Sequence, residues 1–308
     1  MPPVMKLFPK ELVRWQDSLP MTLREGRILM EKLFENGTLT LKEAGVQKLA
    51  EEKEANSGKP VIKLKNLYFR YAKNADDVLR GLNLEIEEGK LHCLLGGNGS
   101  GKSTTLKAIC EIIKPQSGKV KIADNCRAAM VPQNPQALFT EISCEEEVLE
   151  GLCYQKLEIE EKVQRTEDML KLMEIEHLRK ANPYDLSGGE QQRLALAKVM
   201  VSNPDILLLD EPTKGLDPFF KQTLGRILRS LCKDNKTIFM VSHDIEFCAE
   251  FGDRCSMFFD GEIATSGSAK EFFSGNNFYT TVENKLTRKW CEGIITGEEA
   301  RTWIRSLL

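Results

Sequence analysis

The chain has 308 residues, of which 41% are hydrophobic and 29% are charged, an ordinary balance for a soluble globular protein. Its 43 Lys and Arg residues against 46 Asp and Glu residues give a formal charge of −3 and a pI of about 5.9, which disfavours a nucleic-acid-coating protein. The mean hydropathy is −0.33, and no run approaches the roughly 18 apolar residues that a membrane-spanning helix needs, so we expect no membrane crossing.

The cysteines and the N-terminus indicate a compartment. Nine cysteines are scattered without a C-x-x-C pair, and their number is odd. This usage is typical of reduced thiols in a cytosol, not of a disulfide framework or a zinc site. The first residues lack the continuous apolar core of a secretion signal, so none is expected.

Residues 1–59 differ in pattern from the rest and are expected to form a helical tail or linker. Thr22 and Glu25 make a capping-box pattern, which predicts a helix that Asn36-Gly37 ends. A second helix is expected over 39–50, followed by a charged tether over 51–59. Such short helices bury little surface, so the segment must dock on something or stay loosely attached. The apolar residues of the first helix that share helical spacing are Ile28, Leu29, Leu33 and Phe34.

From residue 61 the pattern changes to strands that alternate with helices. Short apolar runs suit strands buried on both faces, as in a parallel sheet covered by helices. Strand signals vanish between 134 and 185, where 147–154 and 158–175 have helical patterns, so we expect a helical insertion in an α/β domain. The expected strands are 61–69, 78–86, 91–95, 128–131, 206–209, 237–241 and 255–259.

A glycine-rich loop follows the expected strand 91–95. It matches G-x-x-x-x-G-K-[ST] and opens a helix that is expected to run through Ile113. Glycines let backbone N–H groups turn toward a polyphosphate, and the helix N-terminus adds its positive dipole end. We expect Lys102 at the β- and γ-phosphates and the Ser103 hydroxyl on Mg²⁺. The residues assigned to this cradle are Gly96, Gly97, Asn98, Gly99, Ser100, Gly101, Lys102, Ser103 and Thr104.

Two carboxylates follow the apolar run 206–209. Asp210, beside a phosphate loop, is placed to hold the Mg²⁺ shell, and Glu211 would be the base that polarises an attacking water. The plainer interpretation is an acidic strand exit, because Pro212 follows at once. The occurrence of both carboxylates beside a phosphate loop favours the site.

The segment LSGGEQQR begins at Leu186, about twenty residues before Asp210. Here the chain resembles the ATPase subunits of ATP-binding-cassette (ABC) transporters, whose signature is LSGGQ or LSGGE. Its small residues let backbone N–H groups and a serine hydroxyl approach a γ-phosphate, and the next helix presents its N-terminus. The resemblance implies a second nucleotide clamp formed by Ser187, Gly188, Gly189 and Glu190.

The resemblance covers about residues 61–273 and implies roles for further residues. Tyr71 would stack on adenine, although an ordinary surface tyrosine fits the sequence too. Gln133 matches the glutamine that reaches Mg²⁺ and links the core to the helical insertion. Asp217 lies in the stretch that matches the loop communicating between the halves of a dimer. His243 matches the switch histidine that contacts the γ-phosphate.

The implied fold is α/β: a phosphate-loop ABC ATPase core with an N-terminal antiparallel β part and a helical subdomain insertion over about 134–190. The ATPase domain is expected over 60–273 and a C-terminal helical extension over 274–308. His92 and His177 are expected to be structural. ATP and Mg²⁺ are the implied cofactors, with Ser103, Gln133 and Asp210 on the metal. The implied catalytic residues are Glu211, His243 and Lys102.

The resemblance also implies partners. In the family the signature loop covers the ATP of a partner in a head-to-tail dimer, so a second ABC ATPase domain is expected. The stretch after Gln133, which contains Leu138 and Phe139, resembles the ATPases of energy-coupling-factor importers, which take up vitamins and transition-metal ions in prokaryotes. These two residues could line a groove for the coupling helix of a transmembrane partner or pack inside the helical subdomain. Ser143 and Glu146 form a second capping box, which predicts that a helix begins there.

The importer interpretation places the protein on the cytoplasmic face of a prokaryotic cell membrane. A transmembrane energy-coupling subunit and a substrate-binding membrane protein are its expected partners, and nucleic acid is not. Residues 1–50 and 274–308 resemble the flanks of the second half of a fused two-cassette ATPase. One alternative is a soluble ABC ATPase acting on DNA ends or ribosomes, but the long insertion or basic face usual there is not visible. Another is a regulatory module with little turnover, which the intact Glu211 and His243 disfavour.

Overall fold

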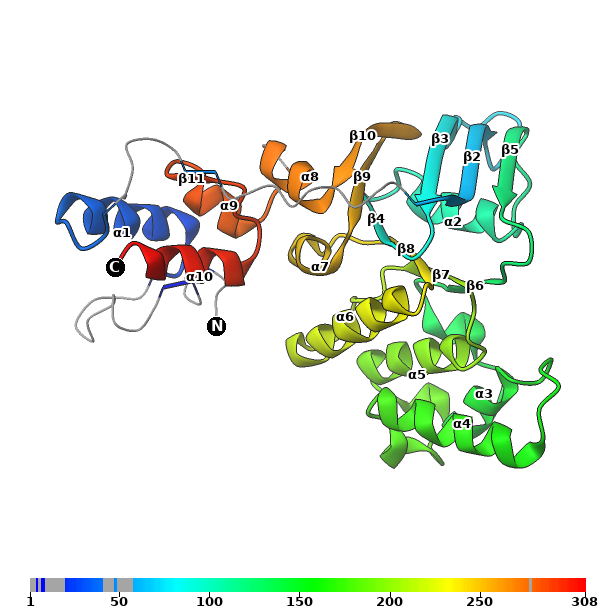
Figure 1. Ribbon diagram of the computed structural model, residues 1–308. Helices are drawn as coiled ribbons and strands as arrows, with labels where there is room; N and C mark the ends of the chain where they lie inside the picture. The colour runs from blue at the N-terminus through cyan, green and yellow to red at the C-terminus, as the bar shows by residue number, and fades with distance from the viewer. Residues whose placement is uncertain (1–3, 5–6, 9–19, 41–46, 49–57, 277–278) are drawn as a thin grey trace. The chain divides into compact units, whose positions relative to one another are not determined.

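The computed structural model describes residues 4, 7–8, 20–40, 47–48, 58–276 and 279–308 (Figure 1). The chain divides into two compact units. The larger unit comprises residues 57–243 and 253–266, and the smaller unit comprises residues 1–56, 244–252 and 267–308. In the ranges described, no helix has the length and apolar character needed to span a membrane.

A mainly parallel sheet forms the centre of the larger unit, with strand order β10-β9-β4-β8-β7-β6. The pairs β4/β9, β4/β8, β7/β8 and β6/β7 are all parallel. Strands β4, β7 and β8 are buried along their whole length, which explains their short uninterrupted apolar runs. The bounds are β4 Leu91–Gly96, β6 Ala128–Val131, β7 Ile206–Asp210, β8 Thr237–Val241, β9 Arg254–Phe259 and β10 Glu262–Ser268.

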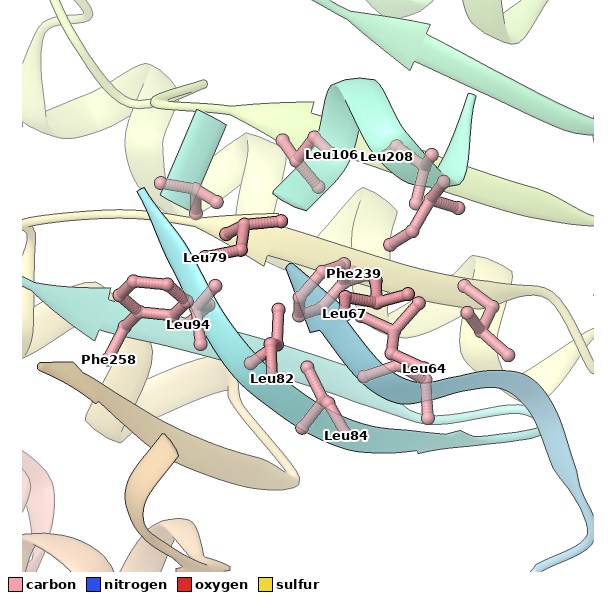
Figure 2. Close-up of a cluster of buried hydrophobic side chains, with 14 of the residues drawn as sticks. Leu64, Leu67, Leu79, Leu82, Leu84, Leu94, Leu106, Leu208, Phe239 and Phe258 are labelled. Carbon is pink, nitrogen blue, oxygen red and sulfur yellow. The ribbon is translucent and has the colours of Figure 1, made fainter. Parts of the chain in front are cut away.

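An antiparallel sheet with the order β3-β2-β5 covers the parallel sheet and helix α2 (Lys102–Ile109). Figure 2 shows side chains such as Leu67 and Leu82 from the antiparallel sheet directed toward Leu94 and Phe239 of the parallel one. Full burial of one such side chain contributes roughly 1.5–3 kcal/mol. This core holds β4 in place, and the glycine-rich loop begins at the end of β4. The bounds are β2 Pro60–Phe69, β3 Leu79–Glu87 and β5 Ser117–Ile122.

A helical insertion lies between β6 and β7, as predicted. It contains α3 (Cys144–Glu150), α4 (Ile159–Leu172) and α5 (Gly188–Met200), with short 3₁₀ turns that include η3 (Pro135–Leu138). Helix α3 begins before the expected residue 147 because Ser143 caps it by accepting from the Glu146 N–H, the capping contact that the sequence predicts. After β7, α6 (Pro218–Lys233) packs against β8 and β4.

The smaller unit has a core of its own, built from both ends of the chain. Met30 and Leu33 of α1 share it with Leu286, Trp303 and Ile304. Strand β1 pairs in parallel with β11. The two terminal segments expected over 1–59 and 274–308 thus lie in one unit, which sequence-local patterns do not indicate. The bounds are α1 Leu23–Glu35, β1 Gln47–Lys48, α7 Ile245–Phe251, α8 Ala269–Gly275, α9 Val282–Thr287, β11 Cys291–Glu292 and α10 Gly297–Ser306.

Some local expectations differ from the structure. Helix α1 has the predicted capping box, but its buried residues are Gly26, Met30 and Leu33, while Ile28 is 43% exposed. Gln47 and Lys48 form a strand instead of continuing the helix expected over 39–50, and residues 41–46 and 49–57 lie outside the described residues. Helix α2 ends at Ile109, short of Ile113. The left-handed backbone of Glu111 (φ 57°) is incompatible with helix continuation.

Strands β5 and β10 were not expected from the sequence. Their burial patterns contain no fully buried position, so they lack the apolar runs that marked the other strands. Each is the edge strand of its sheet, paired on one side only, β5 with β2 and β10 with β9, and pairing defines them more than composition does.

Candidate functional site

The glycine-rich loop joins β4 to α2 at the carboxyl end of the parallel sheet. Gly101 is the N-cap residue of α2, has a left-handed backbone (φ 118°), and offers no side chain to cap the helix. The first-turn N–H groups of α2 therefore have no side-chain cap at this end. A helix N-terminus in this condition is suited to bind a phosphate group.

The glycines of this loop have two different roles. A Cβ at Gly96 would lie 2.4 Å from the Phe258 carbonyl oxygen, and one at Gly101 would lie 2.9 Å from the Val78 oxygen. At Gly97 and Gly99 a Cβ would meet nothing within 4 Å. The ends of the loop are thus packed against neighbouring strands, while its middle faces open space. Such a loop leaves room for a polyphosphate to approach the backbone.

A buried polar atom supports this fit. The Ser100 hydroxyl is buried and has no hydrogen-bond partner among the described residues. Buried polar groups are nearly always paired, so an unpaired hydroxyl inside a phosphate-type loop is consistent with a bound group that would complete it.

Lys102 folds back over the loop that precedes it. Its Nζ donates to the carbonyl oxygens of Gly96 (3.0 Å) and Gly97 (2.8 Å), and it lies 3.4 Å from His243 Nε2. Burial lowers the pKa of this amine, while the charges of Glu211 and Asp210 oppose the shift. Its ammonium is held beside the loop, where it can exchange carbonyl oxygens for phosphate oxygens.

Ser103 and Asp210 meet at the ends of α2 and β7. Ser103 Oγ donates to Asp210 Oδ1 at 3.0 Å. Burial raises the pKa of the Asp210 carboxyl, and the Ser103 hydrogen bond and nearby lysines oppose this shift. A hydroxyl and a carboxylate are the hard oxygen ligands that Mg²⁺ takes in proteins, so the two residues fit this ion. Gln133, the third expected ligand, is exposed just after β6, and in the described part of the chain no hydrogen bond joins it to either residue.

Glu211 and His243 form a second contact beside Lys102. The His243 Nε2 lies 3.1 Å from Glu211 Oε1, and the His243 backbone N–H donates to Glu211 Oε2 at 3.2 Å. Burial raises the pKa of the Glu211 carboxyl. Desolvation, and then the charge of Lys102, lower the pKa of His243, so this imidazole is neutral at neutral pH.

The backbone of Glu211 is unusual. It is left-handed (φ 54°) although the residue is not glycine, and its N–H donates to the Val241 oxygen of the neighbouring strand at 2.9 Å. Residues in such conformations cost on the order of 1–3 kcal/mol and cluster at functional sites. The hydrogen bond to Val241 helps to hold this strained backbone, and with it the carboxylate, just after β7.

Tyr71 lies on the surface next to the phosphate loop. It is 60% exposed, its ring packs edge-on against Phe69, and its hydroxyl is 3.0 Å from the Thr104 Oγ. An open pocket of about 290 Å³ adjoins it, lined by Arg70, Tyr71, Ala72, Lys73 and Gln116. An exposed ring beside an open pocket provides a stacking platform for a base.

The signature segment is located elsewhere, at the start of α5. Ser187 is its N-cap residue, and the side-chain hydrogen bonds of Ser187 go to Glu190 in the described part of the chain. Ser187 and Gly188 are exposed. A Cβ at Gly189 would lie 2.9 Å from the Gly215 oxygen, so this segment packs closely on the turn that leads to Asp217.

Asp217 caps α6 and is joined to the signature helix. Its carboxylate accepts from the backbone of Phe219 and Phe220 and pairs with Arg193 at 2.7 Å. The Arg193 guanidinium also stacks over the Phe220 ring, 3.7 Å from its centroid. Thus the structure brings the signature residues and Asp217 together, and within the described residues no hydrogen bond or ion pair joins them to Lys102. Arg193 follows the signature directly, and sequence reasoning left it without a role.

A buried ion pair that sequence reasoning missed anchors the stretch after Gln133. Glu147 of α3 and Lys198 of α5 pair almost fully buried. Glu147 also accepts from the N–H groups of Thr140 and Glu141, and Lys198 donates to the Leu138 oxygen. An acidic residue at this helical position carries no distinguishing sequence signal, because the pair depends on packing between separate helices.

The structure settles the two interpretations of Phe139. It is only 6% exposed and packs edge-on against Tyr184, so it belongs to the interior of the helical subdomain and lines no open groove. Leu138 is half-buried. His92 is a buried residue that bonds to Ser256 Oγ at 2.7 Å, and burial lowers its pKa to about 3, as suits a structural histidine.

The chain matches known proteins across this site. The family model described as "ABC transporter" matches residues 79–214. A "Putative ABC transporter ATP-binding protein" of Bacillus cereus is 37% identical over 309 residues, 96% of this chain and 54% of that protein. The chain thus spans about half the length of that relative.

Two further matches cover nearly the full length of the known protein. The "Energy-coupling factor transporter ATP-binding protein EcfA1" of Ligilactobacillus salivarius is 32% identical over 79% of this chain and 95% of that protein. The solved dimeric structure of MJ0796, described as a bacterial ABC transporter cassette, superimposes with a TM-score of 0.63 at 33% identity, over 68% of this chain and 98% of that one. The chain belongs to the family of ABC transporter ATP-binding domains, which bind ATP with Mg²⁺ as the usual ion and hydrolyse it.

Proposed function

We propose that this protein supplies the ATP-hydrolysing step of a membrane importer for a micronutrient, a vitamin or a transition-metal ion. The observation that carries the proposal is one cluster, in which His243 Nε2 lies 3.4 Å from Lys102 Nζ and 3.1 Å from Glu211 Oε1, beside the Ser103–Asp210 contact. A phosphate-binding amine, a buried carboxylate base and a neutral imidazole are the groups that hydrolysis of a phosphoanhydride needs.

Each residue has a definite task in this proposal. The N–H groups of residues 97–103 and the Lys102 ammonium bind the β- and γ-phosphates, and Tyr71 stacks on the adenine. Ser103 and Asp210 hold Mg²⁺, with Gln133 as a third ligand; the ion supplies charge neutralisation at the phosphate oxygens. Glu211 takes the proton of the attacking water, and His243, placed against it, donates toward the γ-phosphate.

The signature residues act on the nucleotide of a second cassette. Ser187 and Gly188 are exposed, and the side-chain hydrogen bonds of Ser187 within the described residues go to Glu190 and not to the Lys102 cluster. We propose that Ser187, Gly188, Gly189 and Asp217 close on the ATP held by a partner, head to tail. That a related cassette is dimeric supports this arrangement.

The importer itself is inferred from likeness. The relative EcfA1 is an energy-coupling factor transporter ATP-binding protein, which supports a transmembrane energy-coupling subunit and a membrane substrate-binding protein as partners. The protein would then work on the cytoplasmic face of a prokaryotic membrane. The length of the Bacillus relative supports a further proposal, that this cassette is equivalent to one half of a two-cassette protein.

Two measurements on the full chain test the proposal. Purified chain should hydrolyse Mg·ATP, and chain isolated from detergent-solubilised membranes should bring an integral membrane protein with it. Hydrolysis without a membrane protein, but with bound ribosomes or DNA, would refute the importer while leaving the ATPase. Absence of hydrolysis by chain and membrane complex together would refute both.

A further inference from the structure

At the start of α5, the Glu190 carboxylate accepts hydrogen bonds from both the backbone and the hydroxyl of Ser187. Ser187 N donates to Glu190 Oε2 at 2.8 Å, and Ser187 Oγ donates to the same oxygen at 2.6 Å. The Glu190 N–H donates back to Ser187 Oγ at 3.4 Å. Because a carboxylate only accepts, the hydroxyl proton must come from Ser187. That hydroxyl has a single proton, and in the free chain it is committed to Glu190.

The Glu190 carboxylate that accepts this hydrogen bond is charged. The hydrogen bonds from Ser187 are the main reason that the pKa of Glu190 is lowered, with smaller contributions from His177 and Arg193. Arg193, the nearest strong cation on the same helix, already pairs with Asp217 and Glu174. The N–H groups at the start of α5 favour a bound anion, but the Glu190 carboxylate already places a negative charge there.

We propose that Glu190 is a positioning residue that weakens ATP-driven closure of the cassette on its partner. This inference rests on the proposed function, in which Ser187 approaches a γ-phosphate. For Ser187 to donate to a phosphate it must release Glu190, and the phosphate must approach a carboxylate that repels it. Glu190 thus raises the ATP concentration at which closure occurs.

Replacement by glutamine separates charge from shape. An amide oxygen still accepts from the Ser187 N–H, so the capping box survives, since glutamine serves this position as well as glutamate. The amide N–H₂ group can donate to Ser187 Oγ, which frees the hydroxyl proton for a phosphate. The change also removes one negative charge beside the loop.

The chain offers a matched control at another helix. At the start of α3, Ser143 Oγ donates to Glu146 Oε2 at 2.7 Å, and Glu146 N donates back at 3.3 Å. This is the same hydroxyl-to-carboxylate bond on an exposed cap, with no proposed part in nucleotide binding. Glu146→Gln therefore shares any general effect of neutralising such a cap.

The test measures ATP-driven association of the full chain by sedimentation in Mg·ATP. A Glu211→Gln background prevents hydrolysis during the run. Glu190→Gln should lower the dissociation constant of the assembly by about tenfold, the order expected for removing one close like charge. Glu146→Gln should leave it unchanged. Thermal unfolding of each variant checks that the caps remain folded, because a purely structural role would change the melting temperature and not the association.

The outcomes are distinct. Unchanged or weaker association in Glu190→Gln overturns the inference, as does an equal gain in Glu146→Gln. Ser187→Ala separates this failure from that of the proposed function. If Ser187→Ala weakens association while Glu190→Gln has no effect, the inference alone is wrong. If Ser187→Ala leaves association unchanged, or the Glu211→Gln chain does not associate at all, the proposed function fails and the inference fails with it.

Discussion

Two phosphate-type loops of the larger unit present helix N-termini, but their surroundings are opposite. The loop before α2 lies beside a connected set of groups to which the proposal gives catalytic roles: Lys102 contacts its own loop and His243, and His243 contacts Glu211. The segment before α5 is exposed at Ser187 and Gly188, and its side-chain bonds return to its own cap. One loop is assembled within the chain, and the other is presented outward.

The charges of the two loops also differ. The first ends in a buried lysine, which is the first residue of α2, whereas the second is followed by a carboxylate, that of Glu190, in the first turn of α5. A cation attracts a phosphate on its own, while a capping carboxylate repels one. Under the proposed function, this difference makes binding and closure separate events: ATP would bind to the first loop of a single chain, and the second loop would close only when binding provides enough energy.

The largest expected effect tests whether Glu211, in the cluster beside the first loop, is the base. Glu211→Gln should retain ATP binding but slow turnover by at least about a hundredfold, because a general base contributes on that scale. Steady-state hydrolysis and equilibrium binding of a fluorescent ATP analogue measure the two quantities. Near-normal turnover would remove Glu211 from the role of base.

The next effect tests the cation of the first loop. Lys102→Ala should weaken Mg·ATP binding by roughly ten- to a hundredfold, the range of a charge-assisted bond. Isothermal titration with the single chain measures it. Lys114, an exposed residue beyond the end of α2, gives a control in Lys114→Ala, which should bind as the parent does. Equal affinity of the Lys102 variant and the parent would contradict the cradle assignment.

A third change tests the second loop. Ser187→Ala should leave ATP affinity of the single chain unaltered but reduce turnover by about tenfold, since one hydrogen bond to a charged group is lost only at closure. Titration of ATP into dilute chain, alongside hydrolysis at high chain concentration, separates binding from closure. A fall in single-chain affinity would show that Ser187 touches its own nucleotide, and the two loops would then not be separate.

The smallest effect concerns pH. Burial raises the pKa of Glu211, and a base works only when deprotonated, so turnover should fall as pH decreases through a value above the ordinary 4.5 of a glutamate. The acid limb of the rate–pH profile measures it, with melting temperatures at each pH to exclude unfolding. An acid limb at or below pH 4.5 would contradict the burial of this carboxylate.

The two loops also show how far the sequence could predict the structure. The strands 128–131 and 237–241 were predicted to the residue, since buried parallel strands leave plain apolar runs. The residues of the first loop could be predicted because the glycine-rich motif directly follows a recognisable strand. The capping-box patterns that begin at Ser143 and Thr22 predicted the starts of α3 and α1, where both residues are N-caps, and Thr22 makes the full box.

Long-range packing was not predictable. The Glu147–Lys198 pair, the burial of Phe139 and the shared core of the chain's two ends each depend on segments far apart in sequence. No local pattern distinguishes a buried glutamate from an exposed one in a charged helix. The burial of Phe139 among its neighbours, and not its sequence context, decided between the two interpretations.

The most direct test of the account is a structure of the Glu211→Gln chain assembled with Mg·ATP. The account predicts that Ser187 Oγ of one chain lies within hydrogen-bond distance of the γ-phosphate held by the partner's Lys102. A nucleotide-bound assembly in which Ser187 faces solvent, or contacts the ATP of its own chain, would contradict it.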